Sequence, residues 1–504
     1  MRKIKKSTKI LLFVIISLSF FLNLISFKKG HTWGDDFALY IAQAKSLVEN
    51  SVKSLIEQQM FLEQYSSELH GPLVYPWGFP VLLAPVYKIF GFDIVAMKIY
   101  VFLFFIGSLF ILFYFFEDRI SERFRLLLVS IFALNPVFFY FKEYVLADVP
   151  FLFFTLLGMW MIKLYIIEKR FMINRYISLF LLGFVCFFAY FIKIQGFVLF
   201  VILFLCHIRE YIGLLSNKDS KLLKERCIHL IPYATIALCY LLYRVILYEK
   251  FDYFVYVLFN QDIISTIKNN FIYYFFLPSE FFSSKIALKF IYFVTIPFAL
   301  YGFMVNFKRD YPFALFMIFN IIILLVFPFT TQGIRYIIFI MPFYFYYFVK
   351  GFFEFKKAKS NRPFRKFCVN MMYILMAVLI FSYILRDINY VRKVYKDNWY
   401  TYDGPYSENA TEMINFIRNN TKDDDKIVFF KPRALRLYTN RRTVVNYKID
   451  DIASYGFKYV VVYKNDVEHA YRIKFKDDID KSKLFKKIFE NDEFRIYEFN
   501  MASS

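Results

Sequence analysis

The sequence has few cysteines, and their positions argue against two common kinds of site. Only five occur among 504 residues, namely Cys186, Cys206, Cys227, Cys239 and Cys368. All five lie in or close to apolar segments, and no CxxC or Cys/His spacing typical of a metal site is present. Internal repeats and low-complexity linkers are also missing. Neither a cysteine-ligated metal site nor a disulfide framework outside a membrane is therefore expected.

Apolar residues, by contrast, are abundant. They make up 59% of the chain, with 70 Phe and 41 Tyr. Many lie in runs of about 18 or more residues, which suffice to cross a bilayer core. Lipid offers no partner to backbone N–H and C=O groups, so such runs must be helices. We predict a polytopic α-helical membrane protein with eleven spans near 10–27, 95–116, 124–141, 146–167, 174–192, 195–208, 229–248, 286–305, 312–329, 335–353 and 368–386.

The formal charge of +22 does not indicate a nucleic-acid partner, because the excess of basic residues lies between the predicted spans. Clusters occur before the first span, at 218–226 and at 350–366, as the positive-inside bias predicts. This pattern predicts a cytoplasmic N-terminus. The first loop, 28–94, and the tail from Asp387 would then lie outside the cytoplasm. The apolar segment 10–27 resembles a signal peptide, but no small-residue cleavage site follows it. We therefore expect it to remain as an uncleaved first span.

Two regions outside the predicted spans are also predicted to contain helices or strands. In the first loop, Phe37–Glu49 and Phe79–Phe90 have the periodicity of short helices that lie at a membrane interface. The residue pattern of the tail predicts a small α/β domain. Its expected elements are a helix at Glu408–Asn419, strands at Lys426–Phe430, Thr443–Tyr447 and Lys458–Tyr463, and a hairpin of Lys487–Glu490 with Phe494–Phe499. We expect a catalytic bundle, 1–386, that includes the loop, and an extracytoplasmic domain, 387–504.

Asp35 and Asp36 follow the first span by a few residues and are the leading candidates for chemistry. They could simply form a solvated turn, with Asp36 near the N-cap of the next helix. Alternatively, one of them is a general base. A low dielectric and a neighbouring carboxylate both raise the pKa of an acid, which suits a base.

Three further charged residues fall on the same predicted side of the membrane. Asp148 begins the fourth span, where a carboxylate also suits the helix dipole. Lys193 interrupts an apolar stretch, and ionisable groups at such depth are usually functional or paired, unless they snorkel to the surface. Arg335 opens the tenth span against the positive-inside trend and needs a carboxylate or phosphate partner.

At these residues the sequence resembles the GT-C superfamily of membrane glycosyltransferases. The branch it resembles contains the protein O-mannosyltransferases and the lipid A aminoarabinose transferases. Five segments carry the resemblance: Trp33-Gly34-Asp35-Asp36 through Leu47, Tyr75-Pro76-Trp77-Gly78 through Gly91, Asn135-Pro136 through Glu143 and Asp148-Val149-Pro150, Gln332-Gly333-Ile334-Arg335-Tyr336, and Glu412 through Arg442. The family's acidic residue precedes a Tyr by four positions, as Asp36 precedes Tyr40. Phe37 stands where the family commonly has Glu, so the choice between Asp35 and Asp36 stays open.

The resemblance implies an inverting transferase that uses a polyprenyl-phosphate sugar as its donor. Asp36 or Asp35 would be the general base, and Lys193 and Arg335 would stabilise the departing phosphate. The matching positions also make Asp148, Glu143, Tyr75 and Tyr336 candidate substrate-binding residues. The expected location is a bacterial plasma membrane, with a glycan, lipid or protein as acceptor.

Two other functions compete with this interpretation. A transporter or flippase of lipid-linked sugars would explain the spans and the charges, but not the acidic loop or the tail domain. A sensor would need far fewer spans for its anchor. Metal dependence is left open, because some branches of the family use a divalent ion and others do not.

Overall fold

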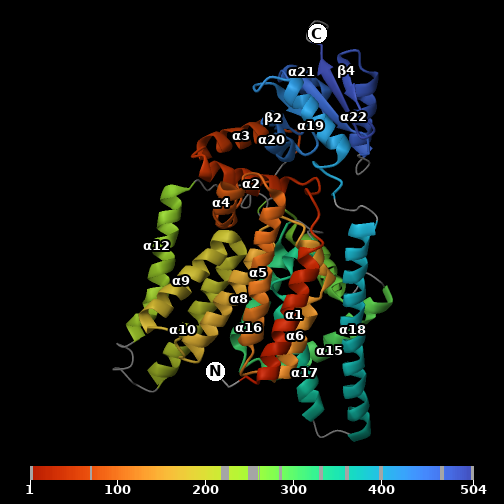
Figure 1. Cartoon of the computed structure of the whole chain (residues 1–504). Helices are drawn as coiled ribbons and strands as arrows, with labels where there is room; N and C mark the ends of the chain where they lie inside the picture. Colours follow the sequence, from red (N-terminus) through yellow and green to blue (C-terminus); the bar gives the residue numbers. More distant parts are fainter. Residues whose placement is uncertain are drawn as a thin grey trace. The chain divides into compact units, whose positions relative to one another are not determined.

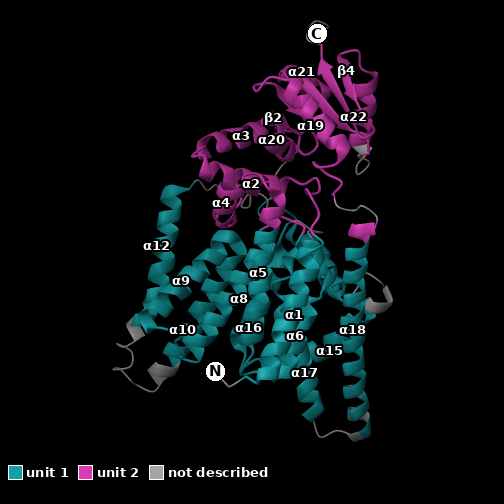
Figure 2. Ribbon diagram, in the orientation of Figure 1, with its two compact units in different colours: residues 1–26, 99–142, 147–392 teal, residues 27–98, 143–146, 393–504 magenta. Residues whose placement is uncertain are grey.

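The computed structural model describes residues 4–68, 71–216, 226–247, 259, 261–282, 286–328, 333–357, 362–396, 401–465 and 470–500. The basic residues at 218–224 and Gln332 of the predicted motif lie outside these ranges. The chain divides into two compact units, which Figure 2 shows in different colours. Unit 1 comprises 1–26, 99–142 and 147–392, and unit 2 comprises 27–98, 143–146 and 393–504.

Unit 1 is helical (Figure 1). Eight helical segments in the described part of the chain are long and apolar enough to cross a membrane. They are α1 (Lys6–Leu24), α5 (Ile94–Phe115), α8 (Asp148–Met161) with the π-helical turns Ile162–Ile167, α9 (Arg175–Ile192), α10 (Phe197–Ser216) with the short turn before it, α12 (Ile231–Ile246), α15 (Ile286–Asn306) and α18 (Arg362–Lys396). The membrane-protein fold is confirmed, and the number eleven stays a prediction.

Five further helices complete the described part of unit 1. They are α6 (Glu122–Ala133), α7 (Pro136–Phe141), α14 (Ile263–Phe276), α16 (Tyr311–Val326) and α17 (Met341–Lys357). The prediction of one continuous span over 124–141 was wrong, because α6 and α7 are separate helices. The break falls at Asn135-Pro136. The residue before a proline avoids the helical region, and the Asn135 side chain accepts from the N–H of Val137 as the N-cap of α7.

The predicted interruption at Lys193–Gly196 is present. Helix α9 ends at Ile192, Lys193 is extended, and Ile194–Gly196 form one 3₁₀ turn before α10. A Cβ atom added to Gly196 would lie 2.3 Å from the backbone of Ala189 and Tyr190. Only glycine therefore allows the chain to reverse this tightly, which holds Lys193 at the junction of two helices.

Helix α18 is longer than the predicted span 368–386, since it continues to Lys396. Asp387 was predicted to begin the tail, but it lies within the helix and is 1% exposed. The prediction treated the charged residues after 386 as the end of the apolar run. Helical backbone continues past them nonetheless.

Unit 2 contains a five-stranded mixed sheet in the order β2-β1-β3-β5-β4. Strands β2 (Arg442–Val444), β1 (Lys426–Val428) and β3 (Tyr459–Tyr463) are parallel, whereas β5 (Phe494–Phe499) is antiparallel to β3 and to β4 (Phe485–Glu490). Four helices accompany the strands: α19 (Glu408–Asn420), α20 (Pro432–Thr439), α21 (Ile449–Ser454) and α22 (Ala470–Lys481). The predicted helix and all predicted strands are confirmed. Helices α20, α21 and α22 were missed.

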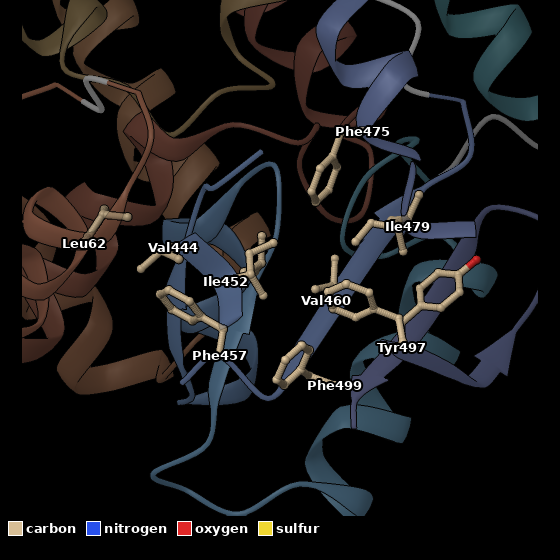
Figure 3. Packing of buried hydrophobic residues seen from close by; sticks show 12 residues of the cluster. Leu62, Val444, Ile452, Phe457, Val460, Phe475, Ile479, Tyr497 and Phe499 are labelled. Atoms are coloured by element: carbon tan, nitrogen blue, oxygen red, sulfur yellow. The ribbon is translucent and has the colours of Figure 1, made fainter. Parts of the chain in front are cut away.

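The first loop supplies three helices to unit 2: α2 (Asp35–Val48), α3 (Val52–Tyr65) and α4 (Gly78–Phe90). Helices α2 and α4 correspond to the two predicted loop helices, and α3 was not predicted. Leu62 of α3 is 1% exposed and belongs to the core cluster of the sheet with Val444, Val460 and Phe499, as Figure 3 shows. An apolar side chain from the loop thus completes the hydrophobic core of the carboxyl-terminal domain.

Hydrogen bonds extend this association along the chain. The N–H of Ser67 donates to the carbonyl of Val445 at 2.9 Å, and the N–H of Val445 donates to the Ser66 hydroxyl at 3.3 Å. The loop is therefore grouped with 393–504 rather than with the helical bundle. This division differs from the predicted boundary at 386, because the prediction followed the order of the chain and not its packing.

Truncating Leu62 tests whether the shared core matters for stability. We expect Leu62→Ala to lower the free energy of unfolding of unit 2 by about 2–5 kcal/mol, the usual range for a buried leucine. Met60→Ala is the matched control on the same helix, since Met60 is 53% exposed and should change stability by less than about 0.5 kcal/mol. Thermal unfolding of the full-length protein measures both, and equal losses would contradict the shared core.

Candidate active site

Helix α2 carries the acidic pair in its first turn. Its N-cap is Gly34, so Asp35 and Asp36 both lie inside the helix, near its positive end. Asp36 thus lies near the N-cap, as the simple loop interpretation expected, but within the helix rather than in a turn before it. Asp36, Tyr40 and Gln43 are spaced i, i+4 and i+7 and share one face of the helix. The four-residue spacing of Asp and Tyr in the sequence therefore has a structural meaning.

Tyr75 lies against this face. Its hydroxyl donates to Oδ1 of Asp36 at 2.6 Å, and its ring stacks on Tyr40 with centroids 4.8 Å apart. The Gln43 amide clamps the Tyr75 backbone, donating to its carbonyl at 2.9 Å and accepting from its N–H at 3.1 Å. Burial and the Asp36 charge raise the pKa of Tyr75 well above its usual value. Tyr75 therefore stays protonated and keeps donating to Asp36 at neutral pH.

Asp35 points to a different partner. Its Oδ1 accepts from the N–H of Ala434 at 3.2 Å, in the first turn of α20. That turn has unsatisfied N–H groups and receives no side-chain hydrogen bond from its own N-cap residue, Lys431. Asp35 thus caps a helix from the carboxyl-terminal domain, while Asp36 faces Tyr75.

Arg433 connects α20 to the first loop. It is 4% exposed, and it donates to the Gln59 side chain at 3.0 Å and to the carbonyl of Pro72 at 2.6 Å. Gly71, with φ of +82°, lies between Arg433 and Tyr75, because a Cβ added there would be 3.6 Å from Nη1 of Arg433 and 3.9 Å from the Tyr75 hydroxyl. Arg433 and Gln59 also line a cavity of about 240 Å³. A cation and a small polar cavity therefore lie beside the Asp36–Tyr75 pair.

Glu143, predicted to bind substrate, is fully buried in an ion pair. Its Oε2 lies 3.0 Å from Nζ of Lys98, and its carboxylate accepts from the N–H of Lys28 at 3.2 and 3.3 Å. The Lys98 ammonium also donates to the carbonyl of Lys28 at 2.9 Å. These contacts join the two ends of the stretch 27–98 to the short stretch 143–146 of unit 2, and they favour a structural role for Glu143. Lys98 was missed, although a single lysine in a predicted span was a signal of the same kind as Lys193.

The same part of unit 2 contains a neutral histidine. His31 stacks on Phe37 with centroids 3.8 Å apart, and its Nε2 accepts from the N–H of Val145 at 3.3 Å. Nδ1 therefore carries the proton and donates to the carbonyl of Thr32 at 3.0 Å. Burial lowers the pKa of His31 to about 3. His31 thus supports the start of α2 without adding charge.

The remaining predicted residues gather in unit 1. Lys193 Nζ lies 2.5 Å from Oδ1 of Asp148, which is buried in the first turn of α8. The Tyr336 ring interacts with both cations, with Lys193 Nζ 4.9 Å and Arg335 Cζ 5.2 Å from its centroid. Residues distant in sequence therefore form one charged cluster, which we name the Lys193–Arg335 cluster: Asp148, Lys193, Arg335 and Tyr336.

The structure thus brings the candidates together in two groups. Asp35, Asp36, Tyr75 and Glu143 belong to unit 2, and the Lys193–Arg335 cluster belongs to unit 1. Among the described residues, no three His, Cys, Asp or Glu side chains gather in a way that would hold a metal ion. The adjacent Asp35 and Asp36 turn to different partners, so they do not make a ready-made chelate, and we derive no step through a metal.

Part of the chain resembles a known protein family, and its fold resembles that of solved membrane proteins. Residues 74–248 match the family model of dolichyl-phosphate-mannose-protein mannosyltransferases. No curated protein sequence matches the chain. Among solved structures, ArnT from Cupriavidus metallidurans in the apo state has a TM-score of 0.53 at 10% identity over 97% of this chain and 98% of that one. ArnT bound to undecaprenyl phosphate has a TM-score of 0.54 at 11% identity, over 96% and 97%.

A third structure is the oligosaccharyltransferase AglB from Archaeoglobus fulgidus, in complex with an inhibitory peptide and a dolichol-phosphate. It has a TM-score of 0.58 at 10% identity, over 90% of this chain and 69% of that one. The chain therefore shares its fold with these membrane proteins, and one part of it resembles the mannosyltransferase family. The predicted resemblance to the GT-C membrane glycosyltransferases is confirmed at the level of the fold, and the family-model match favours the enzyme interpretation over the transporter and the sensor. The family-model match covers Tyr75, Asp148 and Lys193.

Removing the Tyr75 hydroxyl tests the Asp36 contact. We expect Tyr75→Phe to lower kcat/KM for sugar transfer about tenfold to a hundredfold, since a hydrogen bond to a charged group contributes roughly 1.5–3 kcal/mol. Tyr87→Phe is the control, because it removes a hydroxyl from α4, away from Asp36. Rates are compared at equal amounts of folded protein. A Tyr75→Phe enzyme as active as the control would show that the hydroxyl does not matter.

The Asp148–Lys193 ion pair leads to a second prediction, which concerns the free energy of unfolding of the protein. Asp148→Asn and Lys193→Gln should each cost about 3–5 kcal/mol, because either change leaves the other charge buried and unpaired. The double variant should lose less than the sum of the two single losses. Thermal unfolding of the four proteins measures the coupling, and simple additivity would mean that the two groups do not interact.

Proposed function

We propose that this enzyme transfers a sugar from a polyprenyl-phosphate donor to an acceptor hydroxyl, with inversion at the anomeric carbon and with Asp36 as the general base. The hydrogen bond between Tyr75 and Asp36 is the observation that carries the proposal. It fixes one carboxylate oxygen of Asp36 and so orients the side chain. A general base needs this kind of orientation, within hydrogen-bond reach of the proton it removes.

The environments of the two aspartates favour Asp36 over Asp35. The Asp35 carboxylate accepts from the backbone N–H of Ala434 in the first turn of α20, which suits a structural cap. Asp36 instead accepts from Tyr75, whose hydroxyl lies near Gly71, and Gly71 lines a polar cavity together with Arg433.

The proposed reaction balances without another reactant. The acceptor oxygen forms a bond to the anomeric carbon while the bond from that carbon to the phosphate oxygen breaks. The proton of the acceptor hydroxyl passes to Asp36, and the electron pair of the broken bond leaves with the phosphate. The products are a glycosylated acceptor and the polyprenyl phosphate.

We assign the Lys193–Arg335 cluster to the phosphate that gains this charge. Arginine and lysine stabilise such a leaving group electrostatically, which is often the largest single contribution to catalysis. Tyr336 contacts both cations and so limits their movement. Support also comes from the two related structures, since ArnT was solved with undecaprenyl phosphate and AglB with a dolichol-phosphate.

We further propose that the enzyme resides in a bacterial plasma membrane with its N-terminus in the cytoplasm. The basic clusters between the predicted spans support this orientation. It would put the acidic pair and the carboxyl-terminal domain within 393–504 on the extracytoplasmic face, where the acceptor would be a glycan, a lipid or a protein.

Paired substitutions of the two aspartates test the proposed base. Asp36→Asn should lower kcat by about 10²–10⁴-fold, because an amide cannot accept the proton. Asp35→Asn should retain transfer within about tenfold, since the amide oxygen still accepts from Ala434. Both are assayed in membranes with a polyprenyl-phosphate sugar, at matched protein levels. Unchanged transfer in both variants, or a greater loss in Asp35→Asn, would reject Asp36 as the base.

A further inference from the structure

A second cavity in unit 2 lies on the side of α3 that faces α20 and β2. Its volume is about 400 Å³, which is within the range of small-ligand sites. From α3 it is lined by Gln58, Phe61, Gln64 and Tyr65, and from the carboxyl-terminal domain by Arg436 and Arg442. Figure 1 shows α3, α20 and β2 near one another. The proposed reaction uses none of these residues.

Arg436 lines this cavity and has an unsatisfied donor. Its side chain is 6% exposed, and Nη1 donates to the carbonyl of Gln58 at 3.2 Å. Nη2 is buried and has no hydrogen-bond partner among the described residues. Burial and the charge of Arg433 lower the pKa of Arg436 to about 9, against the opposite effect of Asp35. A buried guanidinium with an unused N–H is costly unless an acceptor joins it, and an anion is the best acceptor.

The exposed edge of the cavity combines cations with aromatic rings. Phe61 and Tyr65 have centroids 4.8 Å apart, and Arg442 lies 5.8 Å from the Phe61 centroid. Lys426 lies 5.9 and 5.6 Å from the centroids of Phe61 and Tyr65. The one acidic residue that lines the cavity is Glu57, and it is exposed. The balance of charge therefore favours an anion.

The polar groups between the cations suit a molecule with many hydroxyls. Gln58 and Gln64 offer amides, and Ser54 and Thr443 offer hydroxyls. Each can both donate and accept, as recognition of a sugar hydroxyl requires. Aromatic rings provide a flat apolar surface for the C–H face of a sugar ring. A simple inorganic anion would make use of the arginines alone.

We propose that this cavity binds an acidic sugar of the acceptor, with its carboxylate or phosphate on Arg442 and Arg436 and its ring against Phe61 and Tyr65. The idea rests on the proposed transferase function and adds to it the chemical class of the acceptor. Arg442 would meet the acid group at the exposed edge, with Arg436 behind it. Selectivity for the acceptor would then depend on the carboxyl-terminal domain and not on the residues that perform the transfer.

Calorimetric titration of the full-length protein in nanodiscs tests this proposal. The probes are a disaccharide that carries one glucuronic acid, its neutral carboxyl-reduced counterpart, a glucose phosphate and inorganic phosphate. We expect the acidic sugars to bind at least about tenfold more tightly than the neutral one, because a bidentate pair with arginine is a strong contact. The stronger of the two acidic probes identifies whether a carboxylate or a phosphate is preferred.

Three variants locate the binding. Arg442→Gln should weaken the acidic probes about tenfold and leave the neutral one unchanged, and Phe61→Leu should weaken acidic and neutral sugars alike. Lys53→Gln is the matched control, since it removes one exposed positive charge from α3 without lining the cavity. Binding as tight for inorganic phosphate as for the acidic sugars would overturn the sugar assignment. Equal effects of Lys53→Gln and Arg442→Gln would overturn the site.

A further variant separates this proposal from the proposed reaction. Asp36→Asn should abolish transfer yet bind the acidic probes as the unaltered enzyme does, since Asp36 does not line this cavity. Loss of probe binding in Asp36→Asn would contradict an independent acceptor site. Normal transfer by Asp36→Asn together with normal probe binding would reject the proposed base and leave the acidic-sugar site standing.

Discussion

The first loop and the carboxyl-terminal domain share one hydrophobic core, and the arrangement of the acidic pair depends on it. Leu62 is buried among residues of the sheet, and the backbone at Ser66–Ser67 pairs with Val445. This packing holds α20 next to α2, so that Asp35 reaches Ala434 and Arg433 reaches Gln59 and Pro72. The burial of apolar side chains supplies the free energy, while the hydrogen bonds determine which polar groups meet.

Asp35 and Asp36 show how one helix assigns neighbouring residues of the same type to different tasks. Successive residues of an α-helix point about 100° apart. One carboxylate therefore faces the helix surface that carries Tyr40 and Gln43, where it meets Tyr75. The other faces α20 and caps it. Our proposal assigns the transfer of the acceptor proton to the carboxylate beside Tyr75, whereas the carboxylate that meets Ala434 has a structural partner.

The lysines in the apolar segments follow one rule. Lys98 pairs with Glu143, and Lys193 pairs with Asp148. A buried ammonium is costly, and a carboxylate at close range offsets much of that cost. The two pairs differ in what surrounds them. Lys98 and Glu143 are enclosed and also bind backbone groups, which suits a structural joint. Lys193 is partly exposed and lies over Tyr336, whose ring also contacts Arg335, and this cluster of cations suits an anionic ligand.

By itself the sequence determined the helical membrane fold, the two first-loop helices α2 and α4, and every strand of the carboxyl-terminal domain. Length of apolar runs and local periodicity depend only on neighbouring residues, so they can be read directly. The spacing of Asp36 and Tyr40 likewise implied a shared helix face. Tertiary structure alone decided that α3 completes the core of a domain more than 300 residues further along, that Asp35 caps α20, that Glu143 pairs with Lys98, and that Arg433 and Arg436 line cavities. These contacts join distant segments, and local pattern says nothing about which distant segment will bury a given side chain.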